Sequence, residues 1–181
     1  MRVAVYGGAF NPPHVGHAMV VSWILMTGAA DRVILVPAAD HPFGKKMAPF
    51  ATRLAYCQAF AQDIDPGTGR VSWDECEAEL PTPNYSINLL RHLAAKCPGD
   101  KLRFVMGADN LARRADWFGF DDLVREFDPI FVNRAGVVLP EGVEVLSPVF
   151  PDVSSTDVRG RLEAGLPVSH LVSQGVLQLI R

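Results

Sequence analysis

The chain has 181 residues, of which 49% are hydrophobic and 20% charged, a balance typical of one globular domain with a substantial core. Its net charge of −3 gives no overall basic face for nucleic acid, although a local basic pocket for a phosphorylated small molecule remains compatible with it. The apolar run at residues 18–30 is too short to span a bilayer and is interrupted by Gly28, so we expect a buried helix and no membrane partner.

Three cysteines, Cys57, Cys76 and Cys97, lie far apart and form no CxxC pair. A zinc ribbon or a thioredoxin-like motif is therefore not supported. The odd count, together with a first segment that resembles no targeting signal, suits reduced thiols. We expect a cytoplasmic protein, and a homo-oligomer is compatible with the sequence.

Strand and helix patterns alternate along the chain. We expect strands at residues 2–6, 32–36, 70–74, 101–106, 130–133 and 143–146. We expect helices at residues 15–27, 50–62, 85–96, 156–164 and 170–180. Near-continuous apolar strands alternating with helices predict a single α/β domain over residues 1–181, with a mostly parallel sheet and helices on both faces.

Ligands of such sheets bind at the carboxyl ends of the strands, near the point where the strand order reverses. Four segments follow predicted strands, at residues 6–17, 37–46, 107–109 and 133–134. We therefore expect these segments to converge on one crevice.

The first of them, YGGAFNPPHVGH at residues 6–17, carries the clearest chemistry. Small residues let a phosphate approach the backbone, and His14 and His17 are expected on one helical face. The dinucleotide pattern GxGxxG and the P-loop pattern GxxxxGK[ST] are both absent from the chain. A plain strand–helix turn remains an alternative, and a metal pair is weakened by the lack of nearby carboxylate or cysteine ligands.

This string resembles the HxGH signature of the nucleotidyltransferase superfamily, and its full form is most similar to the nicotinate-nucleotide adenylyltransferase family. The resemblance implies a Rossmann-like fold and the transfer of AMP from ATP to nicotinate mononucleotide, giving deamido-NAD and pyrophosphate, with Mg²⁺ on the ATP phosphates. The acceptor phosphate has a second pKa of about 6 and is already ionised, so no general base is required.

Within the string, the resemblance assigns His14 and His17 a catalytic role, as hydrogen-bond donors to the triphosphate. It makes five neighbours ATP-binding: Gly7, Gly8, Ala9, Phe10 and Gly16. We expect Gly8 and Ala9 to leave backbone groups open to the ligand, and Gly16 to let adenine or ribose approach between the histidines.

A second motif, VSSTDVR at residues 153–159, begins a predicted helix. A plain helix cap is the simpler interpretation of its hydroxyls. The resemblance instead implies that Ser155 and Thr156 bind ATP and that Arg159 is catalytic, placing positive charge on the β- and γ-phosphates.

Four further residues have both a structural and a functional interpretation. By resemblance, Gly107 and Asp109 contact adenosine, although Asp109 also suits a helix cap. Arg134 resembles an arginine near adenine, although a solvated surface arginine is the alternative. Arg53 is either structural or faces a phosphate.

The acceptor is assigned by resemblance to Lys45, Tyr85, Ser86 and Trp117, with the rival interpretations of core packing for Trp117 and a solvated charge for Lys45. Asn11 stands where the family commonly has Asp, and the 40–46 loop also departs from its pattern. A related enzyme acting on nicotinamide mononucleotide or another phosphate monoester is therefore one alternative. A non-catalytic nucleotide-binding module is another.

Overall fold

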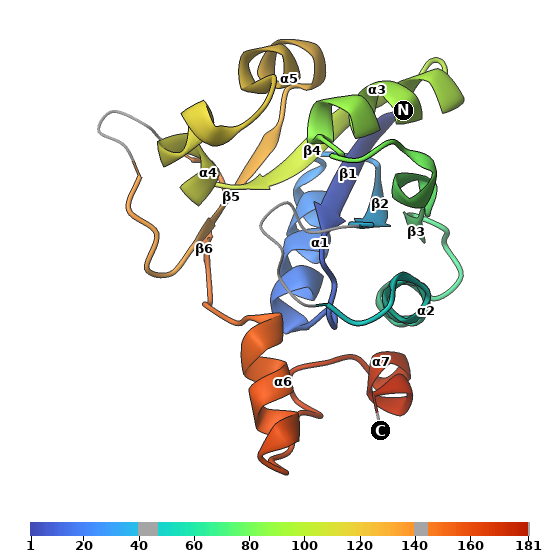
Figure 1. Ribbon diagram of the computed structural model, residues 1–181, viewed down its shortest axis with the longest axis vertical. Helices are drawn as coiled ribbons and strands as arrows, with labels where there is room; N and C mark the ends of the chain where they lie inside the picture. The colour runs from blue at the N-terminus through green and yellow to red at the C-terminus, as the bar shows by residue number, and fades with distance from the viewer. Residues whose placement is uncertain (40–46, 140–144, 181) are drawn as a thin grey trace.

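In the computed structural model, six strands form one sheet in the order β3-β2-β1-β4-β5-β6, and all paired neighbours run parallel (Figure 1). The structure describes residues 1–39, 47–139 and 145–180. The strands are β1 (Arg2–Gly8), β2 (Arg32–Pro37), β3 (Val71–Trp73), β4 (Lys101–Gly107), β5 (Ile130–Arg134) and β6 (Val149–Phe150).

Helices follow most of the strands. They are α1 (Val15–Thr27), α2 (Phe50–Ile64), α3 (Ser86–Lys96), α4 (Asp109–Ala112), α5 (Phe120–Phe127), α6 (Ser155–Glu163) and α7 (Gln174–Leu179). Two short 3-10 helices are η1 (Cys76–Glu79) and η2 (Arg114–Asp116). Among the described residues, none of the helices combines the length and hydropathy needed to cross a membrane.

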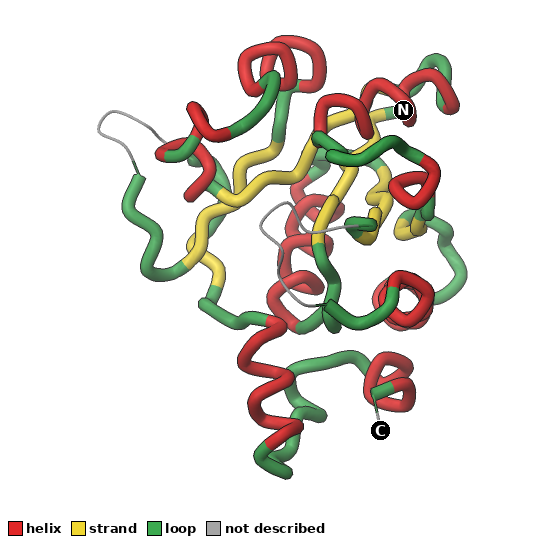
Figure 2. The backbone as a smooth tube through the Cα atoms, viewed as in Figure 1, coloured by secondary structure: helices red, strands yellow, loops and turns green. Residues whose placement is uncertain are grey.

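The sheet lies between two layers of helices, as the tube view shows (Figure 2). Residues that alternate along β1 point to opposite layers: Ala4 packs with α1, α2, α6 and α7, whereas Val3 and Val5 pack with α3 and α5. This alternation follows from the two-residue period of a strand. The expectation of an α/β domain with helices on both faces is confirmed, and the sheet is entirely parallel over the described residues.

The strand order reverses beside β1. The chain proceeds from β1 to β2 and β3 on one side, and then returns so that β4 pairs on the other side of β1. The carboxyl ends of β1 and β4 therefore flank the switch point, where open α/β sheets bind their ligands.

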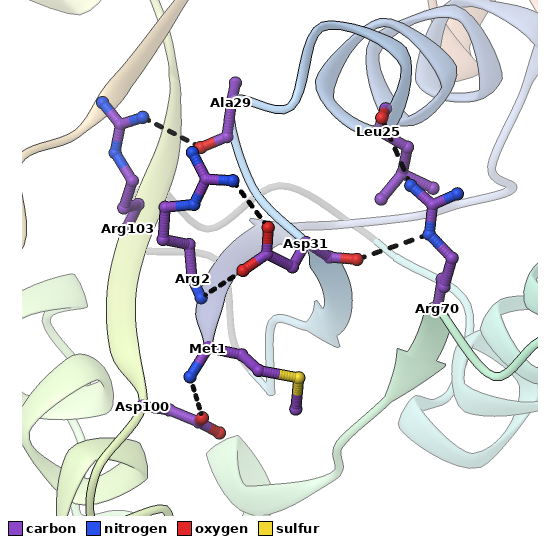
Figure 3. A network of polar contacts seen from close by, with 8 residues as sticks. All are labelled: Met1, Arg2, Leu25, Ala29, Asp31, Arg70, Asp100 and Arg103. Atoms are coloured by element: carbon purple, nitrogen blue, oxygen red, sulfur yellow. Dashed lines mark hydrogen bonds and ion pairs between the residues drawn. The ribbon is translucent and has the colours of Figure 1, made fainter.

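The opposite, amino-terminal edge of the sheet is held by polar contacts (Figure 3). Arg2 donates from its backbone and its guanidinium to the Asp31 carboxylate, over 2.8 and 2.6 Å. Arg103 donates to the Ala29 carbonyl over 3.0 Å. Arg70 donates to the Leu25 carbonyl over 3.2 Å. These bonds join β1, β4 and the residue before β3 to the last turn of α1 and to the α1–β2 connection, away from the switch point.

Two sequence predictions were wrong in their placement, and one further helix was not predicted. The last strand is at Val149–Phe150, where it pairs with β5, and Val145 and Leu146 lie in no strand. Residues 143 and 144 lie outside the described residues. The terminal helix begins at Gln174, because residues 170–173 form a turn before it. Helix α5 was not predicted; its buried Phe120, Leu123 and Phe127 face β4 and α3.

Candidate active site

A cavity of about 520 Å³ lies at the switch point. Eleven of the residues predicted to act on ATP line it: Gly8, Ala9, His14, Gly16, His17, Gly107, Asp109, Arg134, Ser155, Thr156 and Arg159. Segments after β1, β4, β5 and β6 therefore meet here, as expected for three of the four segments that follow predicted strands. Residues 40–46 of the fourth lie outside the described residues.

The two histidines cap the first helix instead of sharing one of its faces. His14 is the N-cap of α1, with an extended backbone at φ −143° and ψ 176°. Its Nδ1 accepts the Gly16 N–H over 3.2 Å, and the Nδ1 of His17 accepts the His14 N–H over 3.1 Å. The reciprocal bonds bring the ring centroids within 3.9 Å of each other. The expectation of one helical face was wrong because His14 lies outside the helix.

These bonds also fix the protonation of both rings. A nitrogen that accepts a hydrogen bond carries no proton, so each neutral ring bears its proton on Nε2. Burial, followed by the charge of Arg134, lowers the pKa of His14 to about 4, while Asp157 opposes this shift. Burial, followed by His14 and Arg134, lowers the pKa of His17 well below its ordinary value. At neutral pH both histidines are therefore neutral donors through Nε2–H.

Gly16 leaves room for the His14 ring. A Cβ built on Gly16 would lie 3.0 Å from both Cε1 and Nδ1 of His14. The backbone carbonyls of Gly8 and Ala9 are also engaged: Gly8 accepts from the Ala38 N–H over 2.9 Å, and Ala9 accepts from Arg53 over 3.1 Å. The expectation of open backbone groups is therefore wrong for these two oxygens.

The second motif is bonded directly to the first. Ser154 is the N-cap of α6 and exchanges hydrogen bonds with Asp157. The Ser155 hydroxyl donates to the Pro12 carbonyl over 2.8 Å, and Arg159 Nη1 donates to the Asn11 carbonyl over 2.7 Å. Two segments more than 140 residues apart thus form one wall, and the amino terminus of α6 opens onto the cavity with its positive dipole end.

Arg134 gives the opposite wall a positive charge. It ends β5, and its Nε lies 3.5 Å from the Asp152 carboxylate. Its charge acts on both imidazoles and on Tyr6, whose phenol is also buried enough that its pKa is raised. With Arg159 it makes the cavity suited to a polyanion, although the whole chain carries a net charge of −3.

The loop after β4 is packed closely. A Cβ on Gly107 would overlap the Asp109 carboxylate. Asp109 is the first residue of α4 and Ala108 is its N-cap, so the alternative of Asp109 as a cap is not supported. Asn110 links this loop to the next: it donates to the Gly107 carbonyl over 3.0 Å and accepts from Trp117 Nε1 over 3.0 Å.

Other predicted residues lie off the cavity wall. Gly7 lies in β1 against Phe104, and Phe10 is buried with its ring against Tyr6 and His17. Tyr85 is the N-cap of α3 and stacks on Phe118 at 4.4 Å, with Ser86 as the next residue. Trp117 packs edge-to-face on Phe104. Lys45 lies outside the described residues. The roles of all these residues stay predictions.

Several lining residues were not predicted as ligands. They are Tyr6, Asn11, Val20, Met47, Asn110, Val132, Asn133, Phe150, Pro151, Val153 and Ser154. Asn133 lies near the carboxyl end of β5, and the sequence had already placed residues 133–134 among the segments expected at the crevice. Phe150 and Pro151 could not be found because β6 was expected elsewhere. Among the described residues, the structure brings together no set of three or more His, Cys, Asp or Glu side chains suited to a metal ion.

A parallel sheet of this order, with two neutral histidines and a helix amino terminus at its switch point, defines a nucleotidyltransferase of Rossmann-like fold. Residues 5–161 match the cytidylyltransferase-like family. The chain belongs to this family and, within it, to the nicotinate-nucleotide adenylyltransferases, which confirms the resemblance found in the sequence.

Two curated relatives are named "Probable nicotinate-nucleotide adenylyltransferase". That of Anaeromyxobacter dehalogenans (strain 2CP-C) is 39% identical over 99% of this chain and 93% of its own length. That of Myxococcus xanthus is 34% identical over 95% of this chain and 87% of its own length. A solved Plasmodium falciparum nicotinic acid mononucleotide adenylyltransferase complexed with NaAD has a TM-score of 0.76 at 16% identity, covering 99% of this chain and 94% of that one, and it supports the fold.

Proposed function

We propose that the protein transfers AMP from ATP to nicotinate mononucleotide, giving deamido-NAD and pyrophosphate. The observation that carries this proposal is the reciprocal capping of His14 and His17. It leaves Nε2–H as the donor of each ring, and both rings line the same cavity as the amino terminus of α6. The family membership and the names of the relatives support the same reaction.

In this proposal, a phosphate oxygen of the acceptor attacks the α-phosphorus of ATP. A P–O bond forms there, the bond to the bridging oxygen between the α- and β-phosphorus breaks, and its electron pair leaves with pyrophosphate. The acceptor phosphate is largely ionised at pH 7, so the protein needs no general base to remove a proton from it. Catalysis rests on orientation and on stabilising the charge of the transition state.

His14 and His17 donate to oxygens that gain charge as the bond breaks. Because both imidazoles are neutral, they act as oriented dipoles and leave the net positive charge to Arg134 and Arg159. Ser155 and Thr156 begin α6, whose backbone N–H groups suit phosphate. Asp109 lines the cavity, and we assign it the role of accepting from ribose hydroxyls.

Mg²⁺ enters with ATP as part of the substrate. Magnesium usually keeps several waters and takes its other ligands from substrate phosphates, so it does not need a cage of protein side chains. The Asp109 carboxylate in the cavity wall is compatible with this hard cation. We propose Mg²⁺ as the divalent ion of the reaction, supplied as the ATP complex.

The acceptor side is assigned to Tyr85, Ser86 and Trp117. Ser86 begins the 11-residue helix α3, and a helix amino terminus with a hydroxyl suits the nicotinate carboxylate. The Trp117 indole N–H donates to the side chain of Asn110, and Asn110 lines the cavity. One residue therefore separates the indole ring from the proposed ATP site. Lys45 is proposed as a further phosphate contact from sequence alone.

The test is pyrophosphate release by the purified protein with ATP, Mg²⁺ and one acceptor at a time. We expect nicotinate mononucleotide to give the highest kcat/KM. A higher kcat/KM with nicotinamide mononucleotide, phosphopantetheine or glycerol phosphate would replace the proposed acceptor and keep adenylyl or nucleotidyl transfer. Binding of ATP without pyrophosphate release on any of these acceptors would favour a non-catalytic nucleotide-binding module.

A further inference from the structure

Arg53 is a buried cation that the reaction described above does not use. It lies on α2 with 1% of its surface exposed, and its guanidinium contacts three backbone carbonyls. Nε donates to Ala48 over 2.9 Å, while Nη1 donates to Ala38 over 2.6 Å and to Ala9 over 3.1 Å. One planar side chain therefore joins three separate stretches of loop.

Each of these stretches adjoins the cavity. Ala9 lines it, directly after β1. Ala38 follows β2, and its N–H donates to the Gly8 carbonyl over 2.9 Å. The Ala48 N–H donates to the side-chain oxygen of Asn11 over 3.3 Å. The Asn11 backbone carbonyl in turn accepts from Arg159, so Ala48 and Asn11 connect Arg53 to the predicted catalytic arginine through hydrogen bonds at different atoms of each residue.

Glu77 supplies the opposite charge. Its carboxylate accepts the Ala39 N–H over 2.8 Å, and it attracts the Arg53 guanidinium electrostatically. Burial raises the pKa of Glu77, and the charge of Arg53 opposes this rise. Buried Arg53 thus holds residue 38 by its carbonyl, and the partly buried Glu77 holds residue 39 by its N–H.

We propose that Arg53 is a positioning residue for the ATP side of the site, which sets the loop after β1 through Ala9 and Asn11. This inference rests on the proposed function, because it assumes that the cavity binds ATP. A guanidinium donates along several fixed directions at once, so it can hold three carbonyls in one arrangement. Arg53 is absent from the cavity lining found among the described residues, and so it acts through its neighbours.

The first test is Arg53→Lys, which keeps the charge beside Glu77 and removes the planar fork. We expect the KM for ATP to rise about tenfold, while the KM for the acceptor changes by less than about threefold. Arg103→Lys is the matched control. Arg103 also donates to two carbonyls at the amino-terminal edge of the sheet. One is that of Ala29, over 3.0 Å (Figure 3), and the other is that of Asp128, over 2.9 Å. The substitution of Arg103 should leave both KM values unchanged.

A second pair of variants separates charge balance from position. Arg53→Met leaves the partly buried Glu77 without its compensating charge and should lower the Tm, whereas Arg53→Met with Glu77→Gln removes both charges. We expect the double variant to regain Tm while its KM for ATP stays raised. Recovery of both quantities would show that Arg53 only balances Glu77, and would overturn the proposal.

Equal KM values for ATP in Arg53→Lys and Arg103→Lys, measured well below both Tm values, would also overturn it. The proposed function is tested separately by pyrophosphate release from the unaltered protein. If that release is absent, calorimetric titration with a non-hydrolysable ATP analogue still compares Arg53→Lys with the control, and weaker binding by Arg53→Lys alone supports the proposal. If the unaltered protein does not bind the analogue, the inference is contradicted, because it requires that the cavity bind ATP.

Discussion

The Cα of Gly16 faces the imidazole of His14 so closely that an added Cβ would lie 3.0 Å from two ring atoms. His14 holds that ring in place by accepting the Gly16 N–H, so the glycine both donates to the ring and leaves space for it. The direction of the Nε2–H donor therefore depends on a residue that has no side chain.

Gly16→Ala should displace the His14 ring and lower kcat about tenfold, because a misplaced donor loses part of its transition-state interaction. The measurement is pyrophosphate release, with Tm recorded on the same sample. Gly160→Ala is the control: it lies in α6, nothing lies within 4 Å of its added Cβ, and alanine should stabilise the helix by about 0.5–1 kcal/mol. Unchanged kcat in Gly16→Ala would mean that the His14 ring is not constrained there.

Acid should destabilise the fold through the two buried imidazoles. Both pKa values are lower in the folded chain than the ordinary 6.5, to about 4 for His14. Between these values the unfolded chain binds more protons, so the free energy of unfolding falls as the pH falls from about 6.5 towards 4, and this contribution is fully retained above 6.5.

His14→Asn tests this because asparagine is a good N-cap and does not titrate. Urea unfolding at pH 7 and pH 4.5 should show that the variant loses about 2 kcal/mol less than the parent between the two conditions. An NMR titration of the His14 ring gives the pKa directly. Parallel losses in parent and variant, or a ring that titrates near 6.5, would contradict the expected shift.

The elements around the switch point were predictable because local signals define them. α1 ends at Thr27 and is capped by Gly28, whose φ of 67° favours glycine, and β2 ends at Pro37. β6 has two residues and exists because Asn133 and Arg134 of β5 pair with it, so no local pattern reveals it. α5 had a usable signal, since Phe120, Leu123 and Phe127 recur at helical spacing.

The candidate site likewise has features that the sequence predicts and features that only the folded chain reveals. The opening and second motifs were recognised by their resemblance to a family, and the structure brings them together. The bonds that join them, from Ser155 to Pro12 and from Arg159 to Asn11, link residues 143 and 148 positions apart, so they depend on the folded chain. Asn11 was noted as a departure from the family, and its amide oxygen is engaged by the Ala48 N–H.

Arg159→Lys should lower kcat about 100-fold with a modest loss of Tm. Lysine keeps the positive charge but cannot donate to the Asn11 carbonyl and the Thr156 hydroxyl while also facing a phosphate. Arg161→Lys on the same helix is the control, because Arg161 donates to the Pro167 carbonyl instead. A similar kcat in both variants would remove Arg159 from its proposed catalytic role.

Trp117→Phe should affect the acceptor more than ATP. Phenylalanine keeps an aromatic ring but loses the indole N–H that donates to Asn110, so the ring is no longer tied to the loop after β4. We expect the KM for nicotinate mononucleotide to rise about fivefold and the KM for ATP to stay within about twofold. Trp23→Phe, in α1 against Phe150, is the control for a lost indole elsewhere. If Trp117→Phe raises both KM values equally, the ring belongs to the packing of β4 and not to the acceptor site.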